Sequence, residues 1–332
     1  MNHRKKYLLQ LKFIIGRAGL AALVAAVLLA ATVGCERKPG TGGTASTTGE
    51  EVARLPLGTI LKQVDNDLRA DTVGGKKDSW YHVALPNNKD GWVFGSFLTR
   101  FDEARKGEIY KSIAVAKLKS DSTNFADWAD LTRWLAAITP EVTDRAALAE
   151  LELGRWSSLQ KAFNNIPVDK LDQPEYQRFI KTNQANAVYS EPGGLWLVKA
   201  DLLWSLQKKY ADLPVGDAIA WEAATLPLPG ECEGDDTCAT IYMTRTKGQY
   251  LQLYPNGKHA SEALDELIQS VQGINEQMVN VATPKGNSKE SQQIRKDALA
   301  AIAKLRACVA KVTNPKKTKL LQLLAKYEKS YR

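Results

Sequence analysis

A long stretch without charged residues near the N-terminus constrains this chain more than any other feature of its sequence. Residues 1–34 carry five basic residues and no acidic one, and the apolar run AGLAALVAAVLLAATVGC ends at Cys35. A basic start, an apolar segment and a small-residue end are the parts of a secretory signal peptide. The apolar part, about 17 residues, is short for a membrane-spanning helix, which needs roughly 20. We expect residues 1–34 to be removed on export, the alternatives being an uncleaved helical anchor and a soluble export product.

The last residues of this run, TVGC, resemble the lipobox of bacterial lipoproteins. The resemblance implies that Cys35 is lipidated and becomes the first residue of a mature chain anchored in a bacterial cell envelope and facing the periplasm. Thr32 stands where the lipobox usually has leucine. Glu36, rather than aspartate, follows the cysteine, and in enterobacterial-type sorting this implies the outer membrane.

The positive charge of the chain is confined to its two ends. The whole chain carries a net charge of +8, whereas residues 1–34 carry +5, residues 285–332 carry +10, and the residues between them carry −7. An acidic body is not expected to bind nucleic acid. We expect residues 285–332 to form basic helices whose cationic faces are either simply solvated or contact anionic lipid, acidic wall polymer or the acidic body.

Export also sets the expected chemistry of the other cysteines. Two cysteines close in sequence favour a disulfide over a metal site in an oxidising compartment, so Cys232 and Cys238 are predicted to staple the loop PGECEGDDTC. A calcium site is the alternative, because the loop also carries the acidic residues Glu231, Glu233, Asp235 and Asp236. Their spacing, however, differs from that of the ligands in an EF-hand loop. Cys308 lies on the apolar stripe of a predicted helix, which indicates a buried free thiol.

The residues after the anchor divide into a linker and a small β domain. Residues 35–48 are rich in Gly, Ser and Thr without large apolar residues, which predicts a flexible tether. Residues 49–101 contain the short apolar runs TILKQV, WYHVAL and GWVFGSFL between polar loops, and such runs predict the strands of a small β-barrel.

The same residues resemble a bacterial SH3 domain. The similarity lies in LPLGTILKQV followed by SWYHVALPNNKDGWVFGSFL, and it implies an SH3-like barrel that binds peptides or cell-wall material. The candidate ligand-binding residues are Trp80, Tyr81 and Trp92; the alternative is that these rings form the barrel core. The family usually opens with a strand of the form LNVRxGP, and here the tether takes the place of that strand.

Helical periodicity dominates from Asp102 onward. Apolar residues recur at three- and four-residue spacing from Phe125 to Ile138 and from Leu148 to Phe163, and Thr139-Pro140-Glu141 between them is typical of a helix boundary. Further helices are predicted at Trp196–Tyr210, Ala218–Thr225, Asp236–Tyr254 and Lys258–Gln272. We therefore expect an α+β chain in which an all-α helical domain (102–284) follows the barrel.

One helix junction resembles the tetratricopeptide-like hairpins of envelope lipoproteins. Within residues 248–267, a helix containing Tyr250 and Tyr254 is followed by the turn Pro255-Asn256-Gly257 and by a restart on small residues. The resemblance implies closely packed neighbouring helices. No fixed repeat period near 34 residues accompanies it, so a regular solenoid is not predicted.

The usual signatures of catalysis are missing from the sequence. After residues 1–34 only His82 and His259 remain, and the chain has no H-E-x-x-H, G-x-S-x-G or phosphate-loop motif. We expect no cofactor and no metal, and predict a non-catalytic, lipid-anchored binding or scaffold protein whose partner is peptidoglycan or an envelope protein. The alternative is a wall-directed, glycan-cleaving enzyme that uses carboxylates alone; its candidate acid is Glu222, in the helix IAWEAA.

Overall fold

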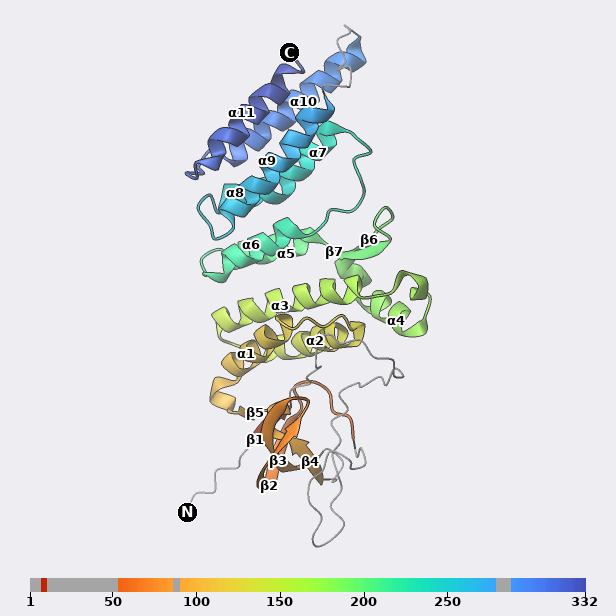
Figure 1. Cartoon of the computed structure of the whole chain (residues 1–332), viewed down its shortest axis with the longest axis vertical. Helices are drawn as coiled ribbons and strands as arrows, with labels where there is room; N and C mark the ends of the chain where they lie inside the picture. Colours follow the sequence, from red (N-terminus) through yellow and green to blue (C-terminus); the bar gives the residue numbers. More distant parts are fainter. Residues whose placement is uncertain (1–6, 11–52, 86–89, 279–287) are drawn as a thin grey trace. The chain divides into compact units, whose positions relative to one another are not determined.

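The computed structural model describes residues 7–10, 53–85, 90–278 and 288–332 (Figure 1). They belong to two compact units, residues 1–165 and 166–332, and each unit is described by itself. The predicted lipidation site Cys35, the tether and most of the predicted signal peptide lie outside the described residues. Within the described ranges, no helix is both long enough and apolar enough to cross a membrane.

The first unit begins with an antiparallel sheet whose strands are arranged in the order β4-β3-β2-β1-β5. The strands are β1 (Tyr7–Gln10), β2 (Ile60–Val73), β3 (Lys76–Ala84), β4 (Asp90–Phe94) and β5 (Leu98–Phe101). Gly74 and Gly75 join β2 to β3 with positive φ angles of 58° and 77°, as a tight two-residue hairpin turn requires. The predicted small β region before the helices is thereby confirmed as a sheet; its closure into a barrel stays part of the proposal below.

Two apolar clusters hold this sheet together. One contains Leu61 and Val83, which are fully buried, with Leu85 and Val93. The other consists of the aromatic residues Trp80, Trp92 and Phe94.

Three helices complete the first unit: α1 (Lys106–Leu118), α2 (Phe125–Ile138) and α3 (Arg145–Asn164). Side chains cap the last two, because Asn124 accepts a hydrogen bond from the N–H of Ala126 and Asp144 accepts one from the N–H of Ala147. The predicted boundary Thr139–Glu141 forms a short 3₁₀ turn between α2 and α3. The predicted apolar stripe of α2 is buried at Trp128, Leu131, Leu135 and Ile138, whereas Phe125 is half-buried.

Aromatic side chains join the sheet to these helices. Phe101 at the end of β5 stacks on Tyr110 of α1, with 6.2 Å between ring centroids, and Tyr110 meets Trp134 of α2 edge to face at 5.7 Å. The Trp134 ring lies directly against Gly58, where a Cβ atom would be only 2.0 Å from the indole nitrogen. Gly58 also has a φ of +80°, so the turn before β2 needs glycine for both conformation and space.

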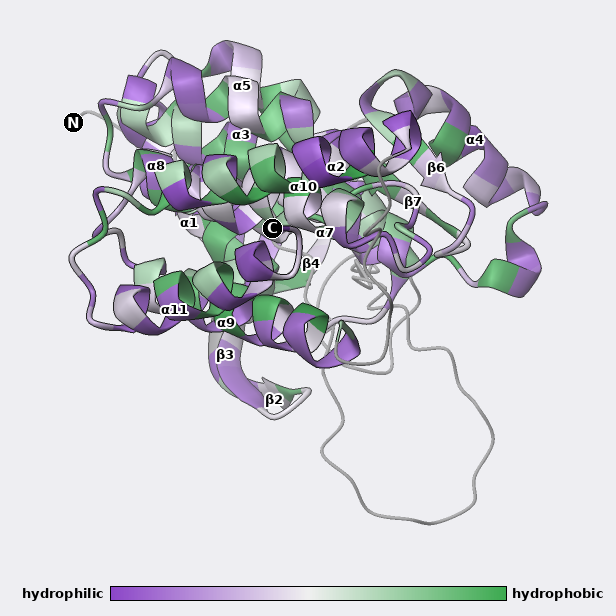
Figure 2. Cartoon of the chain, turned by 90° about the horizontal axis from the view of Figure 1, so that it is seen from above, coloured by the Kyte–Doolittle hydropathy of each residue, from purple (hydrophilic) through white to green (hydrophobic). Residues whose placement is uncertain are grey.

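The second unit is mainly helical (Figure 1). Its elements are α4 (Pro174–Asn183), β6 (Ala187–Ser190), β7 (Leu195–Val198), α5 (Ala200–Lys209), α6 (Val215–Thr225), α7 (Asp236–Met243), α8 (Gln249–Leu253), α9 (Ala260–Gln277), α10 (Lys289–Cys308) and α11 (Lys316–Lys329). A π-helical turn, Thr244–Gly248, joins α7 to α8. Figure 2 shows hydrophilic and hydrophobic residues side by side along α9 and α11.

A single apolar core runs through the second unit from α6 to α11. The helices of the predicted basic segment, residues 285–332, contribute to it with fully or almost fully buried side chains, among them Ile302, Leu305, Leu320 and Leu324. The basic residues of α10 and α11 therefore belong to helices that pack on the same core as α6–α9.

The all-α prediction for residues 102–284 is wrong at one place. A hairpin of β6 and β7 interrupts the helices, with Tyr189 paired to Trp196 across the strands at 5.5 Å between ring centroids. The predicted helix Trp196–Tyr210 therefore begins only at Ala200. The apolar residues Leu195–Val198 run into the apolar face of α5 without a breaker, which hides the boundary, whereas the preceding Pro-Gly-Gly turn, with Gly194 at a φ of +60°, favours a hairpin.

Alkaline pH is expected to destabilise the second unit through its buried tyrosines. Burial raises the pKa of Tyr327, which is fully buried, and also that of Tyr331. Because the folded state favours the neutral phenols, their contribution is complete below the ordinary tyrosine pKa of about 10 and is lost as the pH rises above it. Urea unfolding at pH 9 and 11 should show a smaller free energy of unfolding at pH 11, and a smaller decrease for Tyr327→Phe. An equal decrease in both proteins would contradict this assignment.

Candidate functional site

The structure places the predicted ligand-binding aromatics of the sheet mostly inside it. Trp80 and Trp92 are only 7% and 5% exposed, and Trp80 meets Phe94 edge to face at 5.4 Å between ring centroids. Tyr81 is half-buried and packs against the Leu61 cluster. The two indole rings therefore contribute to the core of the sheet, and of the three residues Tyr81 retains the most accessible position.

Polar side chains lie at the edge of this aromatic cluster. The indole N–H of Trp80 donates to Asp71 Oδ2 at 3.0 Å, and this hydrogen bond, with a second from the N–H of Thr72, lowers the pKa of Asp71. The His82 ring stacks on Trp92 and lies 2.6 Å from Asp90 Oδ2. These contacts tie β2, β3 and β4 together around the buried rings.

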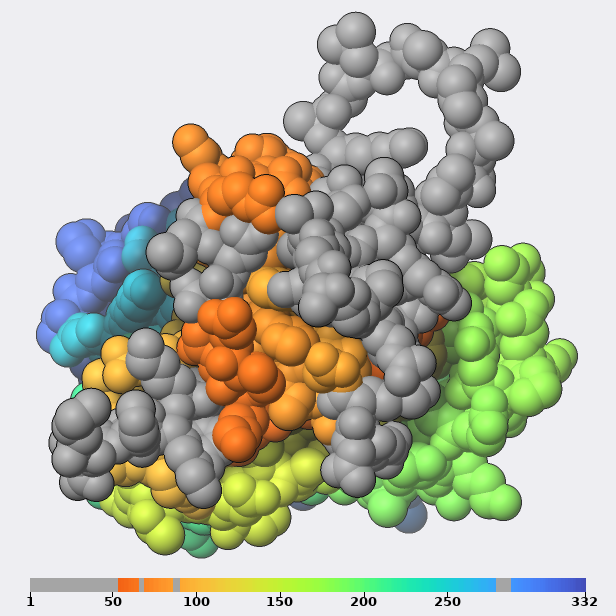
Figure 3. All heavy atoms as spheres, turned by 90° about the horizontal axis from the view of Figure 1, so that it is seen from below, coloured from red at the N-terminus to blue at the C-terminus, as the bar shows by residue number. Residues whose placement is uncertain are grey.

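Large apolar side chains of β2 are exposed instead. Ile60 is 44% and Val64 is 56% exposed, and Val64 lies at an irregularity of the β2–β3 register between Gln63 and Asp65. A β-bulge of this kind redirects a side chain. Residues of the sheet, coloured orange, reach the molecular surface in Figure 3.

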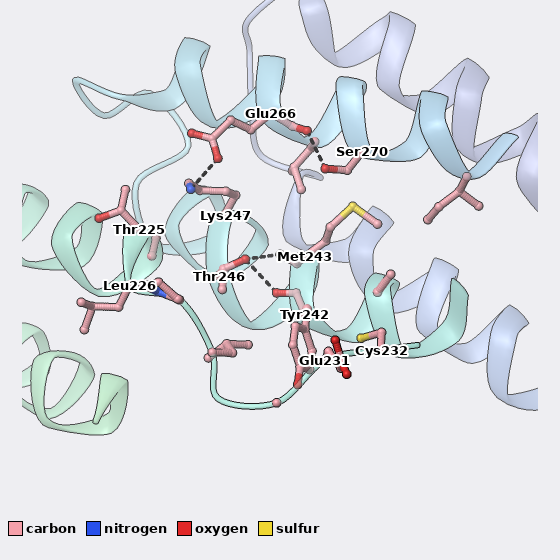
Figure 4. A pocket seen from close by; sticks show the side chains of 17 residues that line it. Thr225, Leu226, Glu231, Cys232, Tyr242, Met243, Thr246, Lys247, Glu266 and Ser270 are labelled. Carbon is pink, nitrogen blue, oxygen red and sulfur yellow. Dashed lines mark hydrogen bonds and ion pairs between the residues drawn. The ribbon is translucent and has the colours of Figure 1, made fainter. Parts of the chain in front are cut away.

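The second unit contains an open pocket of about 530 Å³ (Figure 4). It lies among the C-terminal end of α6, the Leu226–Cys232 loop, α7, the π-helical turn and α9. Its apolar lining includes Leu226, Met243 and Leu267, and hydroxyl groups come from Thr225, Tyr242, Thr246 and Ser270. We call it the loop pocket. Its position beside a π-helical turn is notable because such turns occur often at functional sites.

The charged residues of the helical wall of this pocket neutralise one another. Lys247 Nζ of the π-helical turn lies 2.5 Å from Glu266 Oε2 of α9, and the Lys247 side chain is only 12% exposed. The same ammonium group stands 5.1 Å from the centre of the Trp221 ring. Figure 4 shows this pair, together with the hydrogen bond from Ser270 to the backbone of Glu266. The wall therefore offers a ligand apolar surface and hydroxyl groups rather than an unpaired charge.

The disulfide predicted for Cys232 and Cys238 is present, and Cys232 lines the loop pocket. One of the acidic residues around it has a structural role, since Asp235 caps α7 by accepting hydrogen bonds from the N–H groups of Thr237 and Cys238. Burial raises the pKa of Asp236. No group of three or more His, Cys, Asp or Glu residues within the described ranges is placed to hold a metal ion.

Breaking this disulfide is expected to destabilise the second unit. The crosslink closes a loop with a sequence separation of 6, for which the chain-entropy relation gives about 2 kcal/mol. The double change Cys232→Ser and Cys238→Ser should lower the free energy of unfolding by that amount in urea titrations. Alkylation and mass analysis provide the control, because both cysteines should react only after reduction. Their alkylation in unreduced, denatured protein would contradict the pairing.

Two further predicted positions lie away from the loop pocket. Cys308 is a buried free cysteine, as expected, and burial raises the pKa of its thiol. Glu222 is half-buried on α6, whereas the pocket is lined from that helix by Ala224 and Thr225.

The loop pocket itself was not predicted from the sequence. It combines residues between Ala224 and Ile274 that come from separate elements, and no short motif marks such a set. The local signals are the paired cysteines and the Pro-Leu-Pro-Gly turn that precedes them.

Comparison of the chain with protein-family models, with curated proteins and with solved structures finds no match.

Proposed function

We propose that this chain is a non-catalytic binding and scaffold protein of a bacterial cell envelope, anchored by a lipid on Cys35 and facing the periplasm. In this proposal the sheet forms an SH3-like barrel that binds cell-wall peptide or a protein partner. The helices serve as the scaffold. Delivery to the outer membrane is the favoured destination, on the strength of Glu36 alone.

The observation that carries this proposal is the distribution of apolar side chains in the sheet. Trp80 and Trp92 are buried, whereas Ile60 and Val64 are about half exposed. Exposed apolar side chains on a strand favour association with another chain. The proposed binding surface therefore consists of the exposed apolar side chains of β2, Ile60 and Val64, rather than the indole rings of Trp80 and Trp92.

The loop pocket also fits binding better than catalysis. Glu266 is held in an ion pair with Lys247, whereas the carboxyl group of a general acid must be placed to contact the leaving-group oxygen of the substrate. The remaining lining is apolar with several hydroxyl groups and the carboxylate of Glu231, which suits an amphipathic ligand.

A wall-directed, glycan-cleaving enzyme remains the second candidate. Such an enzyme needs two carboxyl groups on either side of the scissile bond, and Glu222 is the acid that the sequence offers for this role. Purified protein should release no soluble fragments from sacculi. Release by the unmodified protein that is lost in Glu222→Gln would favour the enzyme and contradict the binding proposal.

The test of the binding proposal is sedimentation with envelope material. Replacing Ile60 and Val64 together with lysine should weaken binding at least about tenfold, because burial of each apolar side chain contributes about 1.5–3 kcal/mol. Val168→Lys is the matched control, since Val168 is 69% exposed in the second unit. The unmodified protein, the double lysine variant and Val168→Lys are compared with both isolated sacculi and whole envelopes. Equal sedimentation of all three would place the binding surface elsewhere.

A further inference from the structure

The strand β1 lies between β2 and β5 in the sheet although it is remote in sequence from the other strands. It pairs with β2, where Leu8 stands opposite Leu61 and Leu9 opposite Ile60. On its other side it pairs with β5, where Leu9 stands opposite Thr99. Both pairings are antiparallel. In the strand order β1 lies between β2 and β5 and connects them by backbone hydrogen bonds.

The residues of β1 are also part of the segment that the sequence identifies as a signal peptide. Tyr7–Gln10 precede Cys35, the expected first residue of the mature chain. Removal of residues 1–34 would take away β1 and leave the facing edges of β2 and β5 without the strand between them. Strand edges of this kind have backbone N–H and C=O groups that pair readily with another extended chain.

We propose that in the mature chain the position of β1 is a strand-binding site, which takes an extended apolar segment of a partner protein antiparallel to both β2 and β5. This inference rests on the proposed function, because it requires export and cleavage before Cys35. It goes further by assigning the ligand class, a protein segment held by backbone pairing, and the position in the sheet where that segment binds.

The mature N-terminus itself is a poor occupant of this site. Residues 36–48 read ERKPGTGGTASTT, and proline and glycine are depleted in strands while β-branched apolar and aromatic residues are favoured. The N-terminal segment of a second copy of the chain has the same unsuitable sequence. A different protein with an apolar extended segment is therefore the favoured partner.

The neighbouring side chains define what such a segment needs. The position opposite Leu61 faces a fully buried residue, and Leu98 of β5 packs against the same cluster. A central apolar residue is therefore required there. On β5 the exposed Arg100 stands opposite the same position, and the exposed Lys62 of β2 stands opposite the position before it.

A peptide with the sequence of residues 4–13, RKKYLLQLKF, is the probe for this site. Labelled peptide should bind the mature chain, residues 36–332, and raise its melting temperature. The same peptide with Leu8→Asp should bind at least tenfold more weakly. The full chain, residues 1–332, is the matched control: its own β1 fills the site, so it should not bind the peptide.

Disulfide crosslinking tests the register. Peptide carrying Leu9→Cys should crosslink at least tenfold faster to Thr99→Cys than to Arg100→Cys, and peptide carrying Leu8→Cys should show the reverse preference. A mature chain that folds only when the peptide is added also supports the proposal. Absence of binding at 1 mM peptide by a folded mature chain, or crosslinking without register preference, would overturn it.

The outcomes separate this site from the proposed function. The mature chain could sediment with envelopes in a manner that depends on Ile60 and Val64, and yet not bind the peptide. This result would support the proposed function and contradict the strand-binding site. Native protein that still carries residues 1–34 would overturn both.

Discussion

Replacing Gly58 with alanine is expected to lower the free energy of unfolding of the first unit by about 2–5 kcal/mol. A Cβ atom at this position would lie 2.0 Å from the indole nitrogen of Trp134 and 2.6 Å from its Cδ1 atom. Trp134 is itself only 7% exposed and packs against Tyr110, so the ring has little room to move. Overpacking costs about 1–3 kcal/mol, and the left-handed conformation adds about 1–2 kcal/mol for a residue other than glycine.

Gly75→Ala is the control that separates these two costs. Gly75 has nearly the same φ, +77°, but among the described residues no atom beyond its chain neighbours lies within 4 Å of the position that its Cβ would take. It should therefore cost only about 1–2 kcal/mol. Urea unfolding followed by tryptophan fluorescence measures both variants. Equal effects of the two substitutions would show that the contact between Gly58 and Trp134 does not join the sheet to α2.

Replacing Tyr250 with alanine is expected to lower the free energy of unfolding of the second unit by about 4 kcal/mol or more. The side chain is fully buried at the centre of its core, and truncation of a buried aromatic residue costs about 3–5 kcal/mol. Its hydroxyl donates to Asp217 Oδ1 at 2.7 Å and accepts from the N–H of His259 at 3.0 Å. Alanine would therefore remove both the packing and the link between α6 and the turn before α9.

Tyr250→Phe divides this effect into its parts. It keeps the ring and removes the hydroxyl, which leaves the His259 N–H without that partner and should cost about 1–2 kcal/mol. Circular dichroism during urea titration is the measurement. A loss below 1 kcal/mol for the alanine variant would contradict the central role of this side chain, whatever the phenylalanine variant shows.

The features that the sequence predicted well depend on residues close together in the chain. The Cys232–Cys238 disulfide spans a few residues, and the Pro255-Asn256-Gly257 turn ends α8 and precedes α9 as expected. Gly257 is required there by crowding, since its Cβ would lie 2.6 Å from the Tyr250 hydroxyl oxygen. Local turn chemistry and capping determine such features, so a short sequence window contains the needed information.

The features that the sequence missed depend on contacts between distant residues. The sequence left open whether Trp80 and Trp92 bind a ligand or form the core, and only the fold, which packs them with Phe94, decides for the core. The loop pocket exists only because α9 brings Glu266 to Lys247. The position of β1 is a similar case, because nothing near Tyr7 in sequence indicates that it pairs with both β2 and β5.

The most direct test of the account is the N-terminus of the native protein, because both the anchor and the strand-binding site depend on it. Protein isolated from the membrane fraction should yield an N-terminal peptide that begins at Cys35 and carries the mass of a lipid modification. A Cys35→Ser variant should lack that added mass, because serine has no thiol to carry the lipid. Native protein that begins at Met1 and carries no lipid on Cys35 would contradict the account.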